Sequence, residues 1–176
     1  MPDAELLRSF RFRVTLSGEG YTKDGESEPE DAAFAECSGI KVVNHVLRMR
    51  SGADERGAQG VVPATVEYSN LTLTRGVTFG NRFLDWVFSC FPTFESGANE
   101  KKAVRKTIHI VVLTEEGKEG VAWDLYGAYP VSYSLGNMSS LNSGVLMESI
   151  EFAYSGFERR APGEEELKKK LANANA

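Results

Sequence analysis

The chain has 176 residues, of which 41% are hydrophobic and 26% are charged, and its formal net charge is -5. This length favours one domain, and this composition is typical of a globular protein with a packed core. Together they exclude a collagen-like, disordered or disulfide-framework chain and leave no room for a second catalytic domain.

The negative charge is concentrated in residues 17–33, which combine glycine, serine and proline with acidic side chains. The charged residues of this segment are Glu19, Lys23, Asp24, Glu26, Glu28, Glu30 and Asp31. Because the segment has no apolar periodicity, we predict an acidic surface insertion. The rest of the chain is neutral and has no basic stripe, so direct sequence-specific binding of nucleic acid is not expected.

Neither insertion into a membrane nor secretion through a signal peptide is expected. No apolar run approaches the roughly 20 residues that cross a bilayer, and the N-terminal sequence MPDAELLRSFRFRV lacks the apolar centre of a signal peptide. Cys37 and Cys90 match no metal-ligand spacing. We interpret them as buried or semi-buried thiols, with a disulfide left open as an alternative.

The first half of the chain has strand-like patterning on both sides of the insertion. Apolar and polar residues alternate from Phe10 to Ser17, which predicts a strand with one buried face. Residues 36–50 are extended with a bend or bulge at Gly39, and their apolar residues lie on both faces, so this strand should need two neighbours. Residues 66–75 predict a further strand, closed by glycine.

Between these strands, residues 50–64 are rich in glycine and mixed charge. This segment is longer than the roughly 2–5 residues of ordinary hairpin loops. We therefore predict a long ordered loop with a functional role.

One helix is predicted, over residues 83–91, before a proline that ends the run. Its apolar residues recur at helical spacing: Phe83, Trp86, Val87, Cys90 and Phe91. An aromatic stripe at this spacing could line a ligand groove, but it far more often packs on a sheet. We interpret the stripe as core.

The second half of the chain predicts more strands. Residues 107–113 and 121–126 should form a hairpin with Gly117 in its turn, and Pro130 should mark a bend or a sheet edge before alternation resumes. A loop rich in glycine and serine then leads to a final core strand in VLMESIEFAYSGF. Residues 161–176 predict a short helical or disordered tail.

These elements predict a mainly β fold over residues 1–160. The expected architecture is a small antiparallel β-barrel or sandwich with one flanking α-helix and long loops.

We recognise no catalytic constellation in the sequence. The two histidines, His45 and His109, lie inside predicted strands, where structural or surface roles are more common. HExxH, GxSxG, Walker and strand–GxGxxG–helix motifs are all missing, and Glu115 and Glu116 lie in a predicted turn. We expect no enzyme activity, no cofactor and no metal site. Catalysis would require one of the histidines to meet a carboxylate in a cleft.

Six segments carry a more specific signal when taken in order. They are FAECSGIKV, RMRSG, VEYSNLTLTRGVT, FLDWVF, VAWDLYGAYPVSYS and MESIEFAYSGFE. The most telling pieces are the strand ending LTLTRG, the tryptophan helix after it, the spacing of Trp123, Leu125, Ala128 and Pro130, and the closing strand from Glu148. In this order and spacing, residues 10–158 resemble the inner tube proteins of contractile phage tails and related injection systems.

The resemblance implies a tail-tube fold, a hexameric ring of six subunits, and rings that stack into a rigid conduit for cargo or DNA. The implied partners are further copies of the chain, the contractile sheath protein, baseplate or tube-initiator proteins, and cargo or a tape-measure protein in the lumen. The protein would be synthesised in the bacterial cytoplasm and become a component of a phage virion tail or an assembled injection particle.

The resemblance also implies contacts between subunits, because a ring that stacks needs head-to-tail surfaces. The loop over residues 50–64 should reach the adjacent ring. The candidate polar contacts are Arg50, Asp54, Glu55, Arg56 and Arg75. The acidic insertion and the tail are departures from the family pattern, and we hypothesise that the insertion helps to select the sheath, baseplate or cargo partner.

Two other interpretations stay open at this point. A tube-initiator or baseplate ring protein of the same fold would form rings but need a partner before stacking. A monomeric β-barrel could instead bind a small apolar ligand, with its aromatic side chains lining a cavity rather than filling a core.

Overall fold

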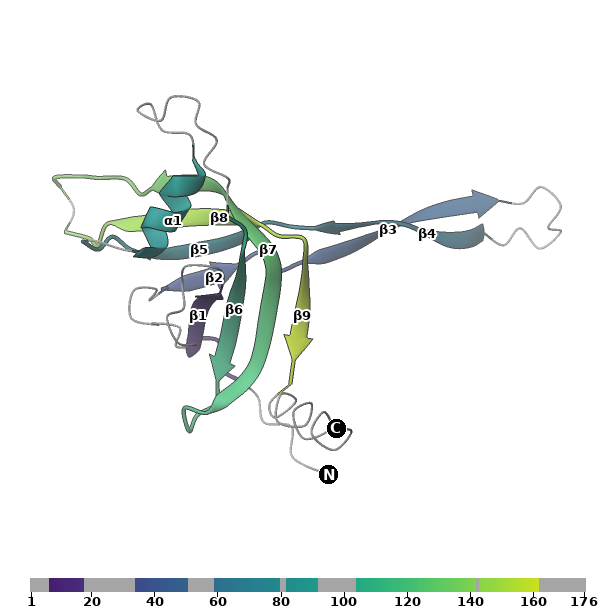
Figure 1. Ribbon diagram of the computed structural model, residues 1–176, viewed down its shortest axis with the longest axis horizontal. Coiled ribbons are helices and arrows are strands. Elements are labelled where there is room, and N and C mark those ends of the chain that lie inside the picture. Colours follow the sequence, from purple (N-terminus) through teal and green to yellow (C-terminus); the bar gives the residue numbers. More distant parts are fainter. Residues whose placement is uncertain are drawn as a thin grey trace.

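The computed structural model describes residues 7–17, 34–50, 59–79, 82–91, 104–141 and 143–161. The strands of this part of the chain are β1 (Phe12–Ser17), β2 (Glu36–Ser38), β3 (Val42–Arg50), β4 (Gln59–Tyr68), β5 (Leu71–Gly76), β6 (Lys106–Leu113), β7 (Glu119–Leu135), β8 (Met147–Ala153) and β9 (Gly156–Arg160). They are accompanied by one helix, α1 (Arg82–Cys90) (Figure 1). The predicted mainly β class with one flanking helix is confirmed.

Seven strands form one antiparallel sheet in the order β1-β6-β7-β8-β5-β2, with β9 beside β7. The N-terminal half of β7 pairs with β6 and β9, and its C-terminal half pairs with β8. We call β1, β6, β9 and the N-terminal half of β7 the β6 half of the sheet. We call β2, β5, β8 and the C-terminal half of β7 the β5 half. β1 and β2 are the two ends of the path, so hydrogen bonds between described strands do not close it into a barrel.

The two halves meet at a bend in β7. The bend is at Gly127, whose φ is +65°, a conformation that favours glycine. The sequence pattern predicted a bend or a sheet edge at Pro130. The edge is confirmed, because beyond Ala128 β8 is the only described strand that pairs with β7. Pro130 lies within β7, where the register with β8 shifts between Pro130 and Ser132, and such an irregularity tolerates a residue that cannot donate to the ladder.

The core lies between the sheet and α1. Phe83, Trp86 and Val87 of the helix are buried, and the Trp86 ring stacks on Phe152 of β8 at a centroid distance of 5.8 Å. The indole N–H of Trp86 donates to the carbonyl of Val104 at 2.9 Å. The helical stripe is therefore core, as predicted.

The strand predicted over residues 36–50 is two strands, which corrects the expectation that it has two neighbours. β2 pairs with β5, and the chain then turns at Gly39 with a φ of +94°. A Cβ atom at Gly39 would overlap the backbone carbonyl of Asn70, so only glycine fits this turn. β3 has β4 as its single neighbour in the described chain.

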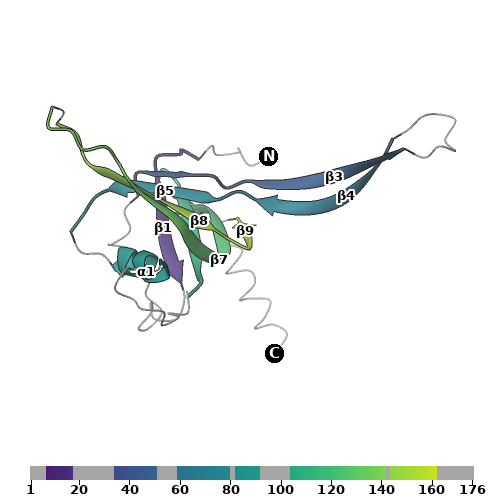
Figure 2. The same ribbon diagram turned by 90° about the horizontal axis from the view of Figure 1, so that it is seen from above.

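β3 and β4 form a long hairpin, the arm, that projects away from the body of the molecule (Figures 1 and 2). The prediction of a loop over residues 50–64 is corrected, because β3 continues to its last residue at 50 and β4 begins at 59. The valines at the start of β4 favour strand structure over the loop that glycine and mixed charge suggested. The predicted strand over 66–75 likewise divides between β4 and β5.

The remaining predictions for the chain ends and insertions fall mostly on residues that are not described. The acidic insertion beyond Ser17, the segment 51–58 and the tail beyond Ala161 lie outside the described residues. No helix in the described residues is long and apolar enough to span a membrane.

Candidate assembly surfaces

The arm has two chemically different faces, which a register shift between Asn44 and Val46 creates. Beyond the shift, Leu47 lies opposite Val62 and Met49 lies opposite a glycine. Because side chains alternate along a strand, these three side chains share one face. We call Leu47, Met49 and Val62 the apolar arm face. Their side chains are 58%, 63% and 44% exposed, respectively.

The opposite face of the arm is mixed in character. Val46 and Arg48 lie opposite Pro63 and Val61 there. The extra residue of the register shift is on β4, so alternation continues along β3 and places His45 on the same face as Leu47 and Met49, nearer the body. There the His45 imidazole and the Glu67 carboxylate are 2.8 Å apart, and both side chains are exposed. His45 thus bridges the two strands of the arm.

A single chain leaves the apolar side chains of the arm exposed to solvent. A two-stranded hairpin is marginally stable in water by itself, and this one exposes apolar side chains along its length and leaves strand edges unpaired. Such exposed edges and patches mark sites of protein association. The arm therefore has the properties of a segment that a further copy of the chain would cover.

The predicted contact residues divide into three groups. Arg50 is the last residue of β3, at the far end of the arm. Asp54, Glu55 and Arg56 lie outside the described residues. Arg75 is buried inside the chain, so it has no surface to offer another subunit, and its prediction as an inter-subunit contact is wrong.

Arg75 and Glu148 form a buried ion pair between β5 and β8. Arg75 Nε donates to Glu148 Oε1 at 2.5 Å, and the Tyr133 hydroxyl donates to Glu148 Oε2 at 3.0 Å. Burial raises the pKa of Tyr133, and the hydrogen bond and charge of Glu148 raise it further. The charge of Arg75 is thus satisfied within the chain.

The outer face of the β5 half, which points away from the core, is lined mainly by short hydroxyl side chains. The strand register places four residues in each of two rows: Ser38, Thr72, Glu151 and Ser132 in one, and Glu36, Thr74, Ser149 and Ser134 in the other. The Thr74 and Ser149 hydroxyls are 3.4 Å apart and hydrogen-bond across the strands. We call this surface the hydroxyl face. Its charged residues within these rows are both glutamates.

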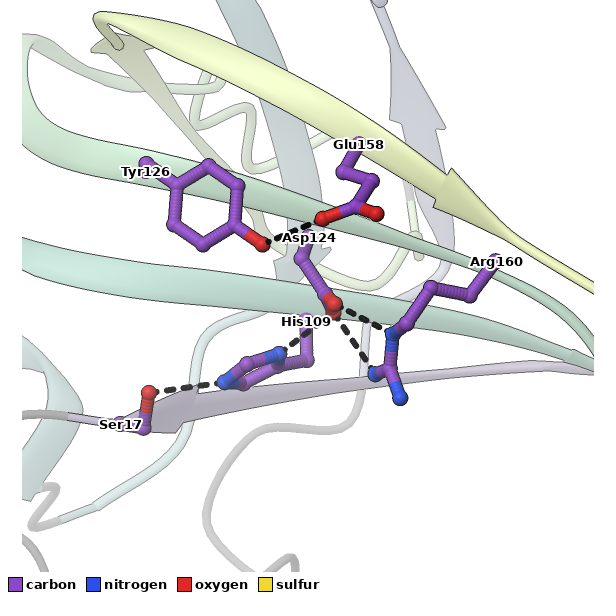
Figure 3. Close-up of polar contacts among 6 residues, drawn as sticks. All are labelled: Ser17, His109, Asp124, Tyr126, Glu158 and Arg160. Carbon is purple, nitrogen blue, oxygen red and sulfur yellow. Dashed lines mark hydrogen bonds and ion pairs between the residues drawn. The ribbon is translucent and has the colours of Figure 1, made fainter. Parts of the chain in front are cut away.

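A polar network covers the outer face of the β6 half (Figure 3). Ser17 Oγ and His109 Nε2 are hydrogen-bonded at 2.7 Å, and His109 Nδ1 donates to Asp124 Oδ1 at 2.6 Å. Arg160 Nη2 donates to the same oxygen at 2.9 Å, and Arg160 Nε is ion-paired with Asp124 Oδ2. Beside them, the Tyr126 hydroxyl donates to Glu158 at 3.1 Å. The network links β1, β6, β7 and β9.

The order of contacts Ser17–His109–Asp124 is that of a hydrolase triad, and sequence reasoning did not find it. In a hydrolase the aspartate stabilises the imidazolium that forms during the reaction, whereas Asp124 is already neutralised by Arg160.

A groove of about 580 Å³ near the open edge between β1 and β2 is lined by Ile110 and Trp123. These residues alternate with His109 and Asp124, so the groove and the network lie on opposite faces of the sheet. We interpret the network as structural, because its hydrogen bonds and ion pair hold β1, β6, β7 and β9 together.

Replacing Asp124 with asparagine is expected to remove an acid-sensitive part of the stability. Burial alone would raise the pKa of Asp124, but hydrogen bonds and charges from Arg160 and His109 outweigh it and hold the pKa below its ordinary value of 3.8. The resulting stabilisation is present above that value and is lost as the pH falls through the folded-state pKa. In urea unfolding at a series of pH values, the wild-type advantage should be full near neutrality and shrink below about pH 4. A difference that stays constant into acid would contradict this.

Both cysteines are free thiols, which excludes the disulfide that the sequence left open. Burial raises the pKa of Cys37 to about 11, with a contribution from the charge of Glu36, and burial also raises the pKa of Cys90. Within the described ranges, no group of three or more His, Cys, Asp or Glu side chains could hold a metal ion.

Comparison with known proteins identifies the family. Residues 8–158 match the family model described as "T4-like virus tail tube protein gp19". No curated protein matches the chain.

Solved structures with similar folds come from the anti-feeding prophage baseplate, from the sheath–tube complex of the extracellular contractile injection system PVC and from the SPP1 tail tube. The first is 20% identical with a TM-score of 0.74, covering 90% of this chain and 97% of that one. The second is 18% identical with a TM-score of 0.69, covering 90% and 94%. The third is 16% identical with a TM-score of 0.59, covering 89% and 80%. On the family match, the chain belongs to the T4-like virus tail tube protein family.

Proposed function

We propose that the chain is the repeating subunit of the inner tube of a contractile tail or injection particle, in which hexameric rings stack head to tail into a conduit. The observation that carries the proposal is the arm. A segment this exposed, with an apolar face and unpaired edges, is stabilised when a second copy covers it. The family match supports the same assignment.

The hydroxyl face supports a role as the wall of the conduit. A surface along which cargo moves should offer few apolar contacts that could hold the cargo in place, and the rows of serine and threonine meet this requirement. Glu36 and Glu151 give the face a negative charge, which disfavours adsorption of an anionic polymer such as DNA. The cargo or a tape-measure protein would slide along this surface.

The outside of the tube would face the other partners. The sheath–tube complex and the baseplate among the similar structures support a contractile sheath and a baseplate or initiator ring as partners of this chain too. The acidic insertion, residues 17–33, is proposed to help select among them. The assembled protein would then be part of a virion tail or an injection particle, after synthesis in the bacterial cytoplasm.

The experiment is to express the protein alone and to examine it by negative-stain electron microscopy. Wild-type protein should form six-fold rings and stacked tubes, whereas the variant Leu47→Asp/Met49→Asp should not form tubes, because docking would bury two charges without partners. Val104→Asp is the matched control, since it places the same charge at an exposed valine outside the arm. Monomeric wild-type protein at high concentration would contradict the proposal. Full-length tubes from the double variant would contradict the role of the arm in stacking.

The similarity to a chain of a baseplate favours one alternative, a ring that initiates a tube. Such a protein would form six-fold rings that stack only after a partner from the same particle is added. Rings without tubes from wild-type protein would favour this alternative.

A further inference from the structure

We propose that the apolar arm face of one copy docks into the connection between β7 and β8 of a copy in the next ring. This inference rests on the proposed function and names the two surfaces that hold stacked rings together. We call residues 136–146 the end loop, of which 136–141 and 143–146 are described.

The position of the two surfaces is the first argument. The arm extends from one end of the long axis of the molecule, and the end loop projects from the other end; two perpendicular views agree on this (Figures 1 and 2). In a head-to-tail stack built along this long axis, all arms point the same way, so each arm meets the opposite end of the next ring. The end loop is the part of the chain that lies there.

The chemistry of the end loop is the second argument. Met138, Leu141 and Val145 are 76%, 92% and 79% exposed, which is unusual for three large apolar side chains in one connection. The sequence of the end loop contains no charged residue. Its apolar surface therefore matches the apolar arm face, whereas the opposite face of the arm carries Arg48.

The shape of the end loop is the third argument. A recess of about 280 Å³ lies between its two limbs, lined by Asn137, Met138, Ser139, Gly144, Val145 and Leu146. A cavity of about 150 Å³ holds a molecule as large as benzene, so this recess has room for an aliphatic side chain such as that of Leu47 or Met49. Each arm would thus insert apolar side chains into a matching recess.

The other candidate acceptors fit less well. The groove near the open edge between β1 and β2 is larger, but it is lined by Ile40, which directly precedes β3. The groove therefore lies beside the start of the arm and not at the opposite end of the molecule. The hydroxyl face has few apolar side chains to receive the arm.

The test uses two variants that each disable one side of the contact. Leu47→Asp/Met49→Asp disables the arm, and Leu141→Asp/Val145→Asp disables the end loop. All four side chains are exposed in the single chain, so both variants should fold. We expect each variant alone to form rings that do not stack. Val104→Asp, which changes neither surface, should form tubes like the wild type.

Mixing the two variants in equal amounts gives the sharper result. A ring with an intact arm can dock on a ring with an intact end loop, but the pair cannot extend further, so the mixture should contain paired rings and no tubes by sedimentation velocity and electron microscopy. Normal tubes from the end-loop variant alone would overturn the inference, and so would the absence of paired rings from the mixture. Failure of wild-type protein to form rings would overturn the proposed function itself.

A cross-link provides an independent readout. The variant Met49→Cys/Leu141→Cys should give a ladder of covalent multimers when assembled tubes are oxidised with copper–phenanthroline, because docking brings the two cysteines within disulfide range. Wild-type tubes should give no ladder, because burial raises the pKa of Cys37 and Cys90 and so disfavours the reactive thiolate. Tubes of the double cysteine variant that give only monomers after oxidation would also overturn the inference.

Discussion

Replacing Glu148 with glutamine is expected to lower the free energy of unfolding by about 3–5 kcal/mol, the usual cost of removing one member of a buried ion pair. Glu148 and Arg75 are among the most completely buried side chains of the chain, so the substitution leaves a guanidinium without its carboxylate in the interior. Because domains of this kind are stable by about 5–15 kcal/mol, this single change should remove a large part of the stability.

The loss should come from burying the Arg75 guanidinium without the Glu148 carboxylate, rather than from the absence of the ion pair as such. The variant Arg75→Met/Tyr133→Phe/Glu148→Leu replaces all three polar groups with apolar ones of similar size, and it should regain most of the lost stability. Glu116→Gln, which breaks the exposed pair with Lys118, is the control and should be nearly neutral. A triple variant no more stable than Glu148→Gln would contradict this explanation.

Replacing Phe152 with alanine is expected to cost about 3–5 kcal/mol of unfolding free energy. The Phe152 ring is fully buried, stacks on Trp86 and contacts Phe83 at a centroid distance of 6.0 Å. The substitution would leave a cavity between β8 and α1, and the rigid neighbouring rings could not collapse into it. The helix would lose the ring contacts of Phe83 and Trp86 with β8.

The control for this substitution is Phe79→Ala. Phe79 is the same residue type, but its side chain is fully exposed, so its loss should leave stability unchanged. All these variants should be compared by urea unfolding at a concentration at which the chain is monomeric, because assembly adds to apparent stability by mass action. A Phe152→Ala variant as stable as Phe79→Ala would show that the core of the isolated chain differs from the one described.

The features that the sequence predicted are those with a local physical cause. The β6–β7 hairpin has Gly117 at a φ of +80° in its turn, as the turn chemistry required. Likewise, the stripe of Phe83, Trp86 and Val87 is the buried side of α1, because apolar residues at helical spacing define a face whatever the rest of the chain does.

The errors concern strands whose ends are determined by their partners. Glycine and mixed charge over residues 50–64 suggested a loop, but pairing with β3 holds residues 59–63 extended. Similarly, Arg75 follows threonines at the end of a strand and was expected to be exposed. Its burial depends on Glu148, 73 positions later in the sequence, and no local pattern encodes that pairing.

By itself, the sequence determined the mainly β class, the helix after β5, the core stripe and the family. Each of these depends on residue type and short-range spacing, which a chain carries before it folds. Only the tertiary structure decided which faces remain uncovered. The apolar arm face depends on a register shift, the hydroxyl face on the alignment of four strands, and the network around Asp124 on partners 15 and 36 positions away. A one-residue change of register would exchange the two faces of a strand, so the surfaces available for assembly are properties of strand pairing rather than of the sequence pattern alone.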